Sequence, residues 1–397
     1  IMGKQDSSAK ASNLSFDEFK KIVLNDFKLA NESRQASLLG RKEVLTGKAK
    51  FGIFGDGKEV AQLAMSKVFQ NGDFRSGYYR DQTFMFAIGA LNLQQWFAGL
   101  YGHTDINFEP MSAGRQMGGH FGTHSLNADG SFKALVEQKN SSSDISPTGG
   151  QMPRLLGLSY ASHFYRINKD LQTQRFSGFS NKGNEVGFGT IGDASTSEGL
   201  FWETINAAGV LQVPMLISVW DDGHGISVPK KYQTTKESIS EILKGFQREN
   251  GGNGYEIFKT KGWDYAHLCE TYEKAIKVCR EEHVPVLVHV EEVTQPQGHS
   301  TSGSHERYKN KERMQWEIDF DCIKQMREWI LNNALANEEE LQVIEEAAKE
   351  AVKNAKNAAW QAYLDPIKNE VAEVCGIFEE LGCEHATAAA KELLAIK

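Results

Sequence analysis

The chain has 397 residues and a formal net charge of −8, with 40% hydrophobic and 24% charged residues. This composition is that of a globular protein long enough for one large α/β domain with helical additions. The negative charge argues against nucleic acid and anionic membranes as partners. No segment approaches the roughly 18 consecutive apolar residues of a membrane span, so we expect no transmembrane helix.

The five cysteines contain no Cys-x-x-Cys pair, which is typical of reduced structural thiols in a cytoplasmic protein. Residues 3–13 are polar and lack the apolar core of a signal peptide. We therefore expect residues 1–13 to be a disordered lead and the protein to be cytoplasmic.

The first half of the chain alternates apolar helical patterns with glycine-rich turns. Ser15 begins a predicted helix over residues 15–41. Further helices are predicted over residues 58–69, 91–101 and 154–167. In the simplest interpretation residues 73–82 are an edge strand, and the polar residues 126–143 are a surface insertion.

The second half alternates strands with helices. Strands are predicted at residues 186–191, 215–220, 255–258 and 284–293, and helices at residues 198–211, 235–246, 265–282 and 312–333. This order predicts an α/β fold with a doubly wound, mostly parallel sheet. We assign residues 14–330 to this domain, including its N-terminal helix, and residues 331–397 to a helical C-terminal extension.

The extension begins at Asn337, which caps a long helix with Glu340 at the reciprocal position of a capping box. We expect this helix to reach about residue 363. Pro366 then starts another helix, which Gly382 ends. Its alanine- and charge-rich face is either solvated or docked on a partner chain.

Acidic residues follow both central strands. Asp193 comes after residues 186–191, and Asp221 and Asp222 come after residues 215–220. A βαβ unit places the carboxyl ends of its strands side by side, at the sheet edge where such proteins bind ligands. Asp193 and Asp222 would repel each other there, and a magnesium ion, completed by the backbone carbonyl of His224, would remove the repulsion.

The turn formed by residues 194–197 leads into a helix N-terminus and carries small hydroxyl side chains. Free backbone N–H groups at such a position suit a phosphate group. The local chemistry therefore predicts magnesium and a phosphorylated ligand. The alternative is an ordinary βαβ crossover whose acidic turns are merely solvated.

The pairs Gly192-Asp193 and Asp221-Asp222, with the spacing between them, resemble the thiamine-diphosphate motif. The similarity is to the alpha subunit of the decarboxylating component of 2-oxo acid dehydrogenase complexes. Ala194 stands where that motif has glycine, and Asp221-Asp222 replaces a pair of asparagines. The extra negative charge of Asp222 should tighten the divalent ion.

Four further motifs match the family in chain order: Tyr79-Arg80, Gly114-Arg115-Gln116-Met117, Ser146-Pro147 and Gly298-His299-Ser300. The second of them resembles the branched-chain members. The resemblance covers about residues 50–330.

The resemblance implies a set of cofactor-binding residues: Tyr79, Arg80, Ser146, Thr148, Gly192, Ala194, Ser195 and His299. Tyr79 and Arg80 would contact the diphosphate, since a guanidinium offers several donors to phosphate oxygens. Thr148 occupies the position of an apolar wedge between the two cofactor rings. Gln151 also matches a position near the cofactor.

At three further positions the chain departs from the family. Gln82 replaces a histidine of the cofactor site, and Trp220 replaces an arginine for the diphosphate. We therefore expect Arg80 to contribute more to diphosphate binding than its family counterpart does. Gly150 stands where branched-chain members have a threonine that helps to hold potassium, which argues against potassium binding.

Two histidines are candidates for the active site. His299 matches the catalytic histidine that faces the reactive carbon of the cofactor, where an imidazole stabilises the substrate carboxylate and a developing oxyanion. Its alternative is a solvent-exposed loop histidine. His120 is a pocket candidate, with a plain loop residue as the alternative. Ser300 aligns with a serine that is phosphorylated in some mitochondrial relatives.

The resemblance implies decarboxylation of a 2-oxo acid, with a preference for branched-chain acids, and transfer of the acyl group to lipoamide on an acyltransferase component. The glutamate that activates the cofactor would come from a beta subunit, in a heterotetramer, or from a fused beta half. Two alternatives stay open. One is a pyruvate or acetoin dehydrogenase alpha subunit, and the other is a scaffold subunit that has lost the cofactor.

Overall fold

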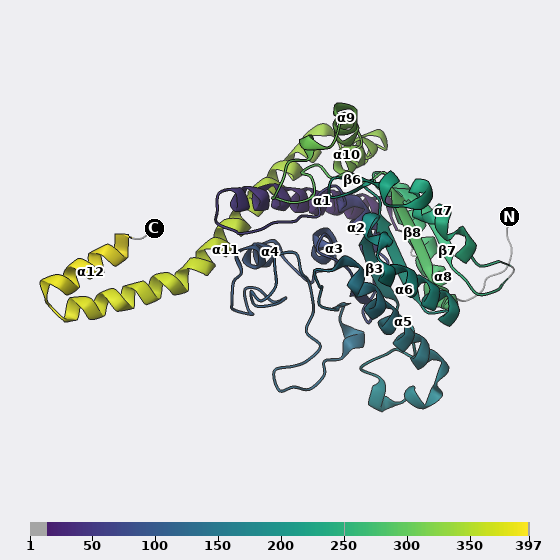
Figure 1. Cartoon of the computed structure of the whole chain (residues 1–397), viewed down its shortest axis with the longest axis horizontal. Coiled ribbons are helices and arrows are strands. Elements are labelled where there is room, and N and C mark those ends of the chain that lie inside the picture. The colour runs from purple at the N-terminus through teal and green to yellow at the C-terminus, as the bar shows by residue number, and fades with distance from the viewer. Residues whose placement is uncertain (1–13, 250, 396–397) are drawn as a thin grey trace.

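A computed structural model describes residues 14–249 and 251–395 (Figure 1). The predicted disordered lead, residues 1–13, lies outside this range. Six parallel strands form one sheet in the order β2-β1-β3-β4-β8-β7. The prediction of a doubly wound α/β fold is therefore confirmed.

The centre of the sheet is formed by β1, β3, β4 and β8, which follow one another in chain order. Strands β2 and β7 lie at its two edges. The bounds of these strands are β1 Phe74–Ser76, β2 Asn140–Ser141, β3 Gly187–Gly192, β4 Met215–Trp220, β7 Glu256–Lys261 and β8 Val286–Glu291. A separate antiparallel pair is formed by β5 His224–Gly225 and β6 Val228–Pro229.

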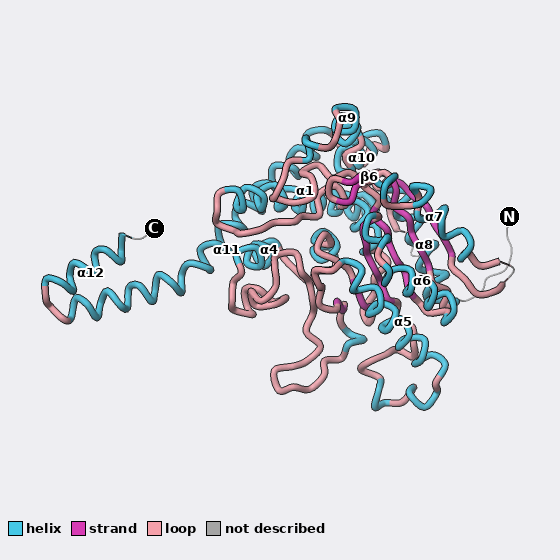
Figure 2. Tube along the Cα trace, viewed as in Figure 1, coloured by secondary structure: helices cyan, strands magenta, loops and turns pink. Residues whose placement is uncertain are grey.

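Helices flank the sheet and form both ends of the described chain. Their bounds are α1 Phe16–Leu45, α2 Glu59–Ser66, α3 Gln82–Ala87, α4 Leu93–Tyr101, α5 Gln151–Ile167, α6 Gly199–Leu211, α7 Ile239–Ile242, α8 Tyr265–Glu282, α9 Lys311–Asp319, α10 Cys322–Asn332, α11 Glu338–Glu380 and α12 Glu384–Ala395. Loops make up most of the segment between α4 and α5 (Figure 2). No helix in the described part of the chain is long and apolar enough to cross a membrane.

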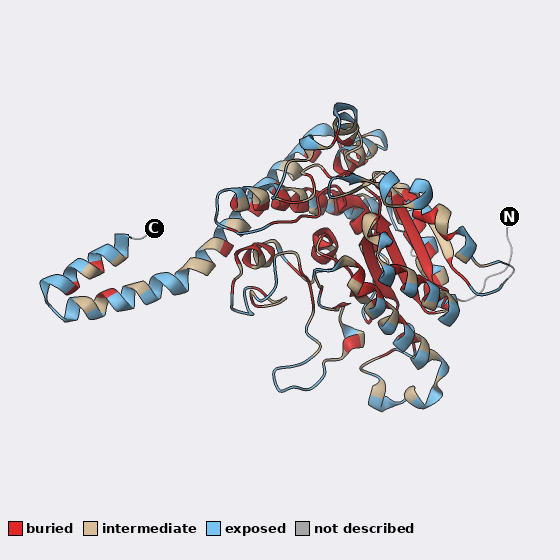
Figure 3. Ribbon diagram, in the orientation of Figure 1, coloured by how far each residue is buried: buried red, intermediate tan, exposed pale blue. Residues whose placement is uncertain are grey.

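The central strands are buried on both faces (Figure 3). Because side chains alternate along a strand, Leu216 and Trp220 of β4 join one hydrophobic cluster while Ile217 and Val219 join the other. Helices α2 and α8 complete the first cluster, and α5 and α6 complete the second. Burial on both faces explains why β4 is a continuous apolar run rather than an alternating one.

Two predicted helices are broken. Residues 235–246 form two 3₁₀ turns around the four-residue α7, because Lys236 and Glu237 have φ values of 60° and 53°. Residues 312–333 divide into α9 and α10, where Asp321 accepts the N–H groups of Ile323 and Lys324 and so caps a new helix.

The predicted helix boundary at Pro366 is wrong, because α11 runs through it without a break. Proline has no N–H for the carbonyl of Ala362, four residues earlier. His103 supplies the replacement donor: its Nε2 lies 3.3 Å from that carbonyl oxygen, while its Nδ1 accepts the N–H of Asp105. The first part of α11 packs on α1 and α4, and α12 folds back on its distal part (Figure 1).

The interpretation of residues 126–143 as a surface insertion is wrong at their C-terminal end. Asn140 and Ser141 are buried and form β2, which pairs with β1. Strand β1 therefore pairs on both sides, with β2 and with β3, and is not an edge strand.

Candidate functional site

Strands β3 and β4 are parallel neighbours, with Gly192 opposite Trp220. The residues that follow them, Asp193, Asp221 and Asp222, form what we call the acidic edge. Asp193 donates its backbone N–H to the carbonyl of Trp220 over 3.1 Å. The sheet therefore brings the two acidic turns together, as the βαβ pattern predicts.

Asp193 is the unsatisfied member of the acidic edge. It is 6% exposed, and its Oδ2 is buried without a hydrogen-bond partner among the described residues. Burial raises the pKa of Asp193 well above its usual range, and the charges of Asp222 and Asp221 raise it further. Such a carboxylate needs a proton or a bound cation.

Asp221 is satisfied by the chain itself. Its Oδ2 lies 2.8 Å from Nζ of Lys230 and 3.1 Å from Nε2 of His289. Burial opposes ionisation, yet the hydrogen bond from His289 and the charge of Lys230 hold the pKa of Asp221 below its usual value. Asp221 therefore does not require a ligand.

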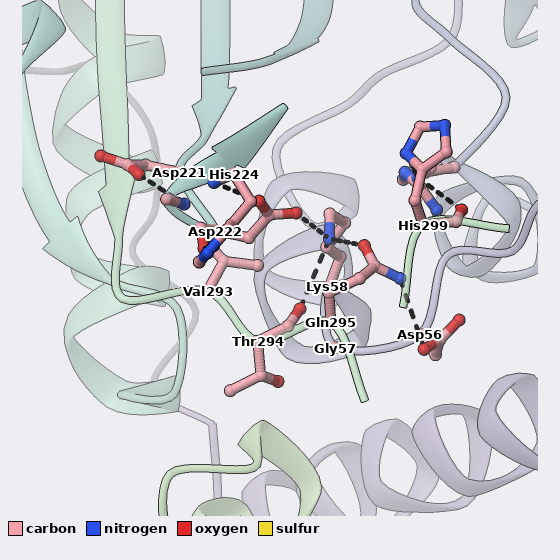
Figure 4. A network of polar contacts seen from close by, with 12 residues as sticks. Asp56, Gly57, Lys58, Asp221, Asp222, His224, Val293, Thr294, Gln295 and His299 are labelled. Atoms are coloured by element: carbon pink, nitrogen blue, oxygen red, sulfur yellow. Dashed lines mark hydrogen bonds and ion pairs between the residues drawn. The ribbon is translucent and has the colours of Figure 1, made fainter. Parts of the chain in front are cut away.

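One carboxylate oxygen of Asp222 accepts a hydrogen bond within its own turn, and the other faces Lys58. Its Oδ1 accepts the N–H of His224 over 3.1 Å, and its Oδ2 lies 3.4 Å from Nζ of Lys58 (Figure 4). Lys58 is 1% exposed, and burial lowers its pKa while Asp222 acts to raise it. The sequence places Lys58 only at the start of a helix and gives no signal for this pairing.

The expected magnesium ligands all come from the segments that follow β3 and β4 at this edge. No group of three or more His, Cys, Asp and Glu side chains is placed to hold a metal in the described residues, but the expected set has only two carboxylates and a backbone carbonyl. The buried, unpaired oxygen of Asp193 is the observation that favours a cation here. Ligation by Asp193, Asp222 and His224 stays a prediction.

The turns that carry Thr148 and Ser195 are joined directly. Oγ1 of Thr148 lies 2.5 Å from Oγ of Ser195 and 2.9 Å from Oε1 of Glu198. Glu198 also accepts the N–H of Gly149 over 3.1 Å. Sequence reasoning missed Glu198, which stands one residue before α6 and looks there like an ordinary helix-initiating acid.

Gly192 and Ala194 flank Asp193 at the end of β3 and the start of the following 3₁₀ turn. A side chain added at Gly192 would have the hydroxyl of Tyr78 as its nearest neighbour, at 4.0 Å. That hydroxyl is buried and has no partner in the described structure. The turn therefore faces a polar group with unused hydrogen-bonding capacity.

His120 and Ser146 are brought together from separate loops. Nδ1 of His120 lies 3.2 Å from the carbonyl of Met117 and therefore carries the proton, so Nε2 accepts from Oγ of Ser146 at 3.2 Å. Burial lowers the pKa of His120, which keeps this tautomer neutral. His120 thus orients Ser146.

Arg80 and His299 form the second half of the site. Arg80 is 4% exposed and donates through Nη1 to the carbonyl of Phe54 over 2.6 Å. Its Nη2 donates to the carbonyl and to Nδ1 of His299, over 2.9 and 3.0 Å. The guanidinium also lies 5.3 Å from the ring centre of Tyr79. Contact of Tyr79 and Arg80 with a diphosphate stays a prediction.

This contact fixes the tautomer of His299. A guanidinium only donates, so Nδ1 of His299 accepts and the proton of the neutral ring is on Nε2. Burial, and then the charge of Arg80, lower the pKa of His299 to about 4. At neutral pH His299 is therefore a hydrogen-bond donor rather than an acid.

The two halves meet at a small cavity. It is lined by Arg80, Asp222, His224, Ile226, Gln295, His299, Tyr308 and Lys309. The loop that carries His299 turns at Gly298, whose φ is +75° and whose Cα faces His305 closely enough to exclude a side chain.

One buried carboxylate, Glu317 of α9, anchors both sides of this cavity. It accepts from Nζ of Lys309 over 2.7 Å and from Nε of Arg313 over 3.0 Å. Lys309 also donates to the carbonyl of Gln295, and Arg313 donates to the carbonyl of Asp222. Sequence reasoning missed this network, although Arg313 and Glu317 have the i, i+4 spacing of a helical ion pair.

Trp220 and Gln82, which replace cofactor-binding residues of the family, contact other parts of the protein. Trp220 is fully buried in a hydrophobic cluster. Gln82 donates to Ser33 and Ser37 of α1 and accepts the N–H of Gly55. Gln82 therefore ties α1 to the glycine-rich turn.

A parallel sheet with an unsatisfied carboxylate at the carboxyl ends of two central strands defines a doubly wound α/β protein with a ligand site at that edge. The chain belongs to the dehydrogenase E1 component family, whose sequence model matches residues 31–367. The predicted family resemblance is confirmed.

Its relatives include alpha subunits of two kinds. The chain is 25% identical over 329 residues to the 2-oxoisovalerate dehydrogenase subunit alpha of Bacillus subtilis (strain 168), covering 81% of this chain and 87% of that protein. It is 24% identical over 222 residues to the pyruvate dehydrogenase E1 component subunit alpha of Rickettsia bellii (strain RML369-C), covering 56% of this chain and 60% of that protein. A mitochondrial 2-oxoisovalerate dehydrogenase subunit alpha 1 of Arabidopsis thaliana is 24% identical over 333 residues, covering 83% of this chain and 61% of that protein.

Proposed function

We propose that this chain is the alpha subunit, or alpha half, of a 2-oxo acid dehydrogenase that uses thiamine diphosphate and magnesium. The observation that carries the proposal is Asp193, a buried carboxylate with an unpartnered oxygen at the carboxyl edge of the sheet. Family membership supplies the chemical context for this unpartnered oxygen.

The metal would be held by Asp193, Asp222 and the carbonyl of His224. The turns containing Ser146, Thr148 and residues 192–195 would lie along the cofactor. The contact between Thr148 and Ser195 supports this arrangement, because it brings two expected cofactor-binding turns together. Thiamine diphosphate, when bound, supplies the nucleophilic carbon and the electron sink for loss of carbon dioxide.

His299 contributes a fixed donor. Its neutral ring, with the proton on Nε2, can donate to a carboxylate or oxyanion of the substrate without first losing or gaining a proton. Arg80 holds this ring from the Nδ1 side. With a pKa of about 4, the ring of His299 is neutral at neutral pH.

We propose a branched-chain 2-oxo acid as substrate and lipoamide on an acyltransferase component as acceptor. The support is the longer alignment with the 2-oxoisovalerate relative than with the pyruvate relative. Pyruvate or acetoin stays the alternative. Turnover on 3-methyl-2-oxobutanoate against pyruvate, with the beta partner present, decides between them.

A beta subunit, or a fused beta half, would complete the active site in a heterotetramer. The free cysteines favour a reducing compartment such as the cytoplasm. Purified alone, the chain should decarboxylate no 2-oxo acid. Turnover without a beta partner would contradict the assignment of the activating glutamate to that partner.

The second candidate is a scaffold subunit without cofactor, favoured by Ala194 and by the burial of Trp220. Calorimetry with thiamine diphosphate and magnesium separates the two functions. Binding that depends on magnesium supports the enzyme. Absence of binding, in the presence of the beta partner, supports the scaffold.

A further inference from the structure

Lys58 carries a buried ammonium group, and its position does not stabilise the helix that follows it. It stands directly before α2, at the positive end of the helix dipole, where a cation is unfavourable. Burying an unpaired ammonium costs several kcal/mol, on the order of the stability of a whole domain. Its location therefore depends on the oxygen atoms that surround it.

Three oxygen atoms surround Nζ of Lys58, and only one of them is charged. Oε1 of Gln295 lies at 2.6 Å, and the carbonyl of Thr294 and Oδ2 of Asp222 both lie at 3.4 Å. Figure 4 shows the ammonium between Asp222 and Gln295. Asp222 is thus the anion that Lys58 pairs with.

The surrounding backbone keeps the ammonium in place. Gly57 has a φ of +86° and packs so closely on the carbonyl of Thr294 that a side chain there would clash. Nε2 of Gln295 lies 3.4 Å from Oδ2 of the buried Asp56, which points Oε1 of Gln295 toward Lys58. These contacts hold Nζ of Lys58 beside Asp222.

Charge at the acidic edge is therefore distributed unevenly. Asp221 has Lys230 and His289, and Asp222 has Lys58. Asp193 has no cation of its own in the described structure. A divalent ion placed between Asp193 and Asp222 would meet one uncompensated negative charge, not two.

We propose that Lys58 is the built-in countercharge of Asp222 and thereby sets the affinity of the acidic edge for divalent cations. This inference rests on the proposed function. An aspartate paired with a lysine carries the same net charge as the asparagine of the related motif. The expectation that Asp222 tightens the ion by its extra charge is thereby cancelled in this chain.

The test is a titration with Mn²⁺ of the full chain together with its beta partner and thiamine diphosphate, in which electron paramagnetic resonance measures the free ion. Lys58→Met removes the countercharge and should tighten Mn²⁺ about tenfold, because affinity rises with ligand charge. Asp222→Asn leaves Lys58 unpaired and should weaken Mn²⁺ by about tenfold or more. The double variant should return to within about threefold of the parent.

Lys67→Met is the control, since Lys67 pairs with the buried Asp26 and not with a residue of the acidic edge. It should shift the Mn²⁺ affinity by less than about threefold. Lys58→Gln provides a second neutral variant if Lys58→Met loses its native circular dichroism. Both neutral variants should act in the same direction.

Three outcomes are distinguishable. Tighter Mn²⁺ binding by either folded neutral variant, reversed in the double variant, supports the inference. Equal or weaker binding by both, with the parent binding normally, overturns the inference and leaves the proposed function intact. A parent that binds no Mn²⁺ with its beta partner present overturns the proposed function and this inference together.

Discussion

Two clusters of buried charge lie at the carboxyl ends of neighbouring strands and differ in what completes them. Arg75 of β1 donates to Oδ2 of Asp81 over 2.7 Å and to both oxygens of Asp144 over 3.0 and 2.9 Å. After β3, no ion pair reaches Asp193 in the described structure. Each cluster contains a carboxylate oxygen without a hydrogen-bond partner, Oδ1 of Asp81 and Oδ2 of Asp193, so the clusters differ in the cation and not in the unpartnered oxygen.

The presence or absence of a cationic partner within the chain distinguishes a structural cluster from a binding site. Bidentate pairing of a guanidinium with carboxylates satisfies most of the buried polar atoms within the chain itself. A buried carboxylate without a cation is costly, so it persists only where something else is bound. The Arg75 cluster is thus a structural anchor, and the acidic edge is a binding site.

The largest expected effect is on catalysis. His299→Ala should lower turnover by about 10²–10⁴-fold, the range for a positioned hydrogen-bonding or acid–base group. Cofactor affinity should change little. Both quantities are measured on one variant with the beta partner present.

The control is His305→Ala, which alters another histidine of the same loop and should retain most turnover. Loss of cofactor affinity by His299→Ala, with normal turnover at saturating cofactor, would make His299 a cofactor-holding residue instead.

Breaking the structural cluster should cost stability rather than binding. Arg75→Met leaves Asp81 and Asp144 buried and unpaired, and should lower the free energy of unfolding by about 3–5 kcal/mol. Urea denaturation measures this change. The exposed Arg115→Met should change it by less than about 0.5 kcal/mol. Equal values for the two variants would remove the distinction between the clusters.

Arg80→Ala tests the cation that the binding region shares with His299. Loss of a charge-assisted contact to phosphate should weaken thiamine diphosphate by about 1.5–3 kcal/mol. Calorimetry in the presence of magnesium gives the affinity. An affinity within twofold of the parent would show that Arg80 serves His299 alone.

The smallest effect is the most direct test of the comparison. Asp193→Asn removes the uncompensated charge and should raise the unfolding free energy of the ligand-free chain by about 1 kcal/mol while abolishing Mn²⁺ binding. Asp221→Asn leaves Lys230 and His289 with a weaker acceptor and should destabilise the chain. Destabilisation by both would place Asp193 among the structural groups.

Sequence reasoning predicted the central βαβ unit because its strands are buried on both faces and its acidic turns follow directly. It also predicted α1, whose capping box at Ser15 is present. It failed at Pro366, because the donor that compensates for proline is His103, distant in the chain.

The candidate site shows the same limit. Asp193, Asp222 and His299 could be found from local motifs. Lys58 and His289 could not, because each pairs with an aspartate that lies far away in the chain and is brought near by the fold. Pairing at long sequence separation leaves no local pattern.

Glu317 connects two segments of the site that lie far apart in the chain. Through Lys309 and Arg313 it supports both the segment leading to His299 and the turn of Asp222. A mutational screen would therefore score position 317 as important for activity, although its carboxylate binds two basic side chains of the protein itself. Engineering of substrate preference in one loop must keep this shared foundation, since a change that relaxes one wall of the cavity also releases the other.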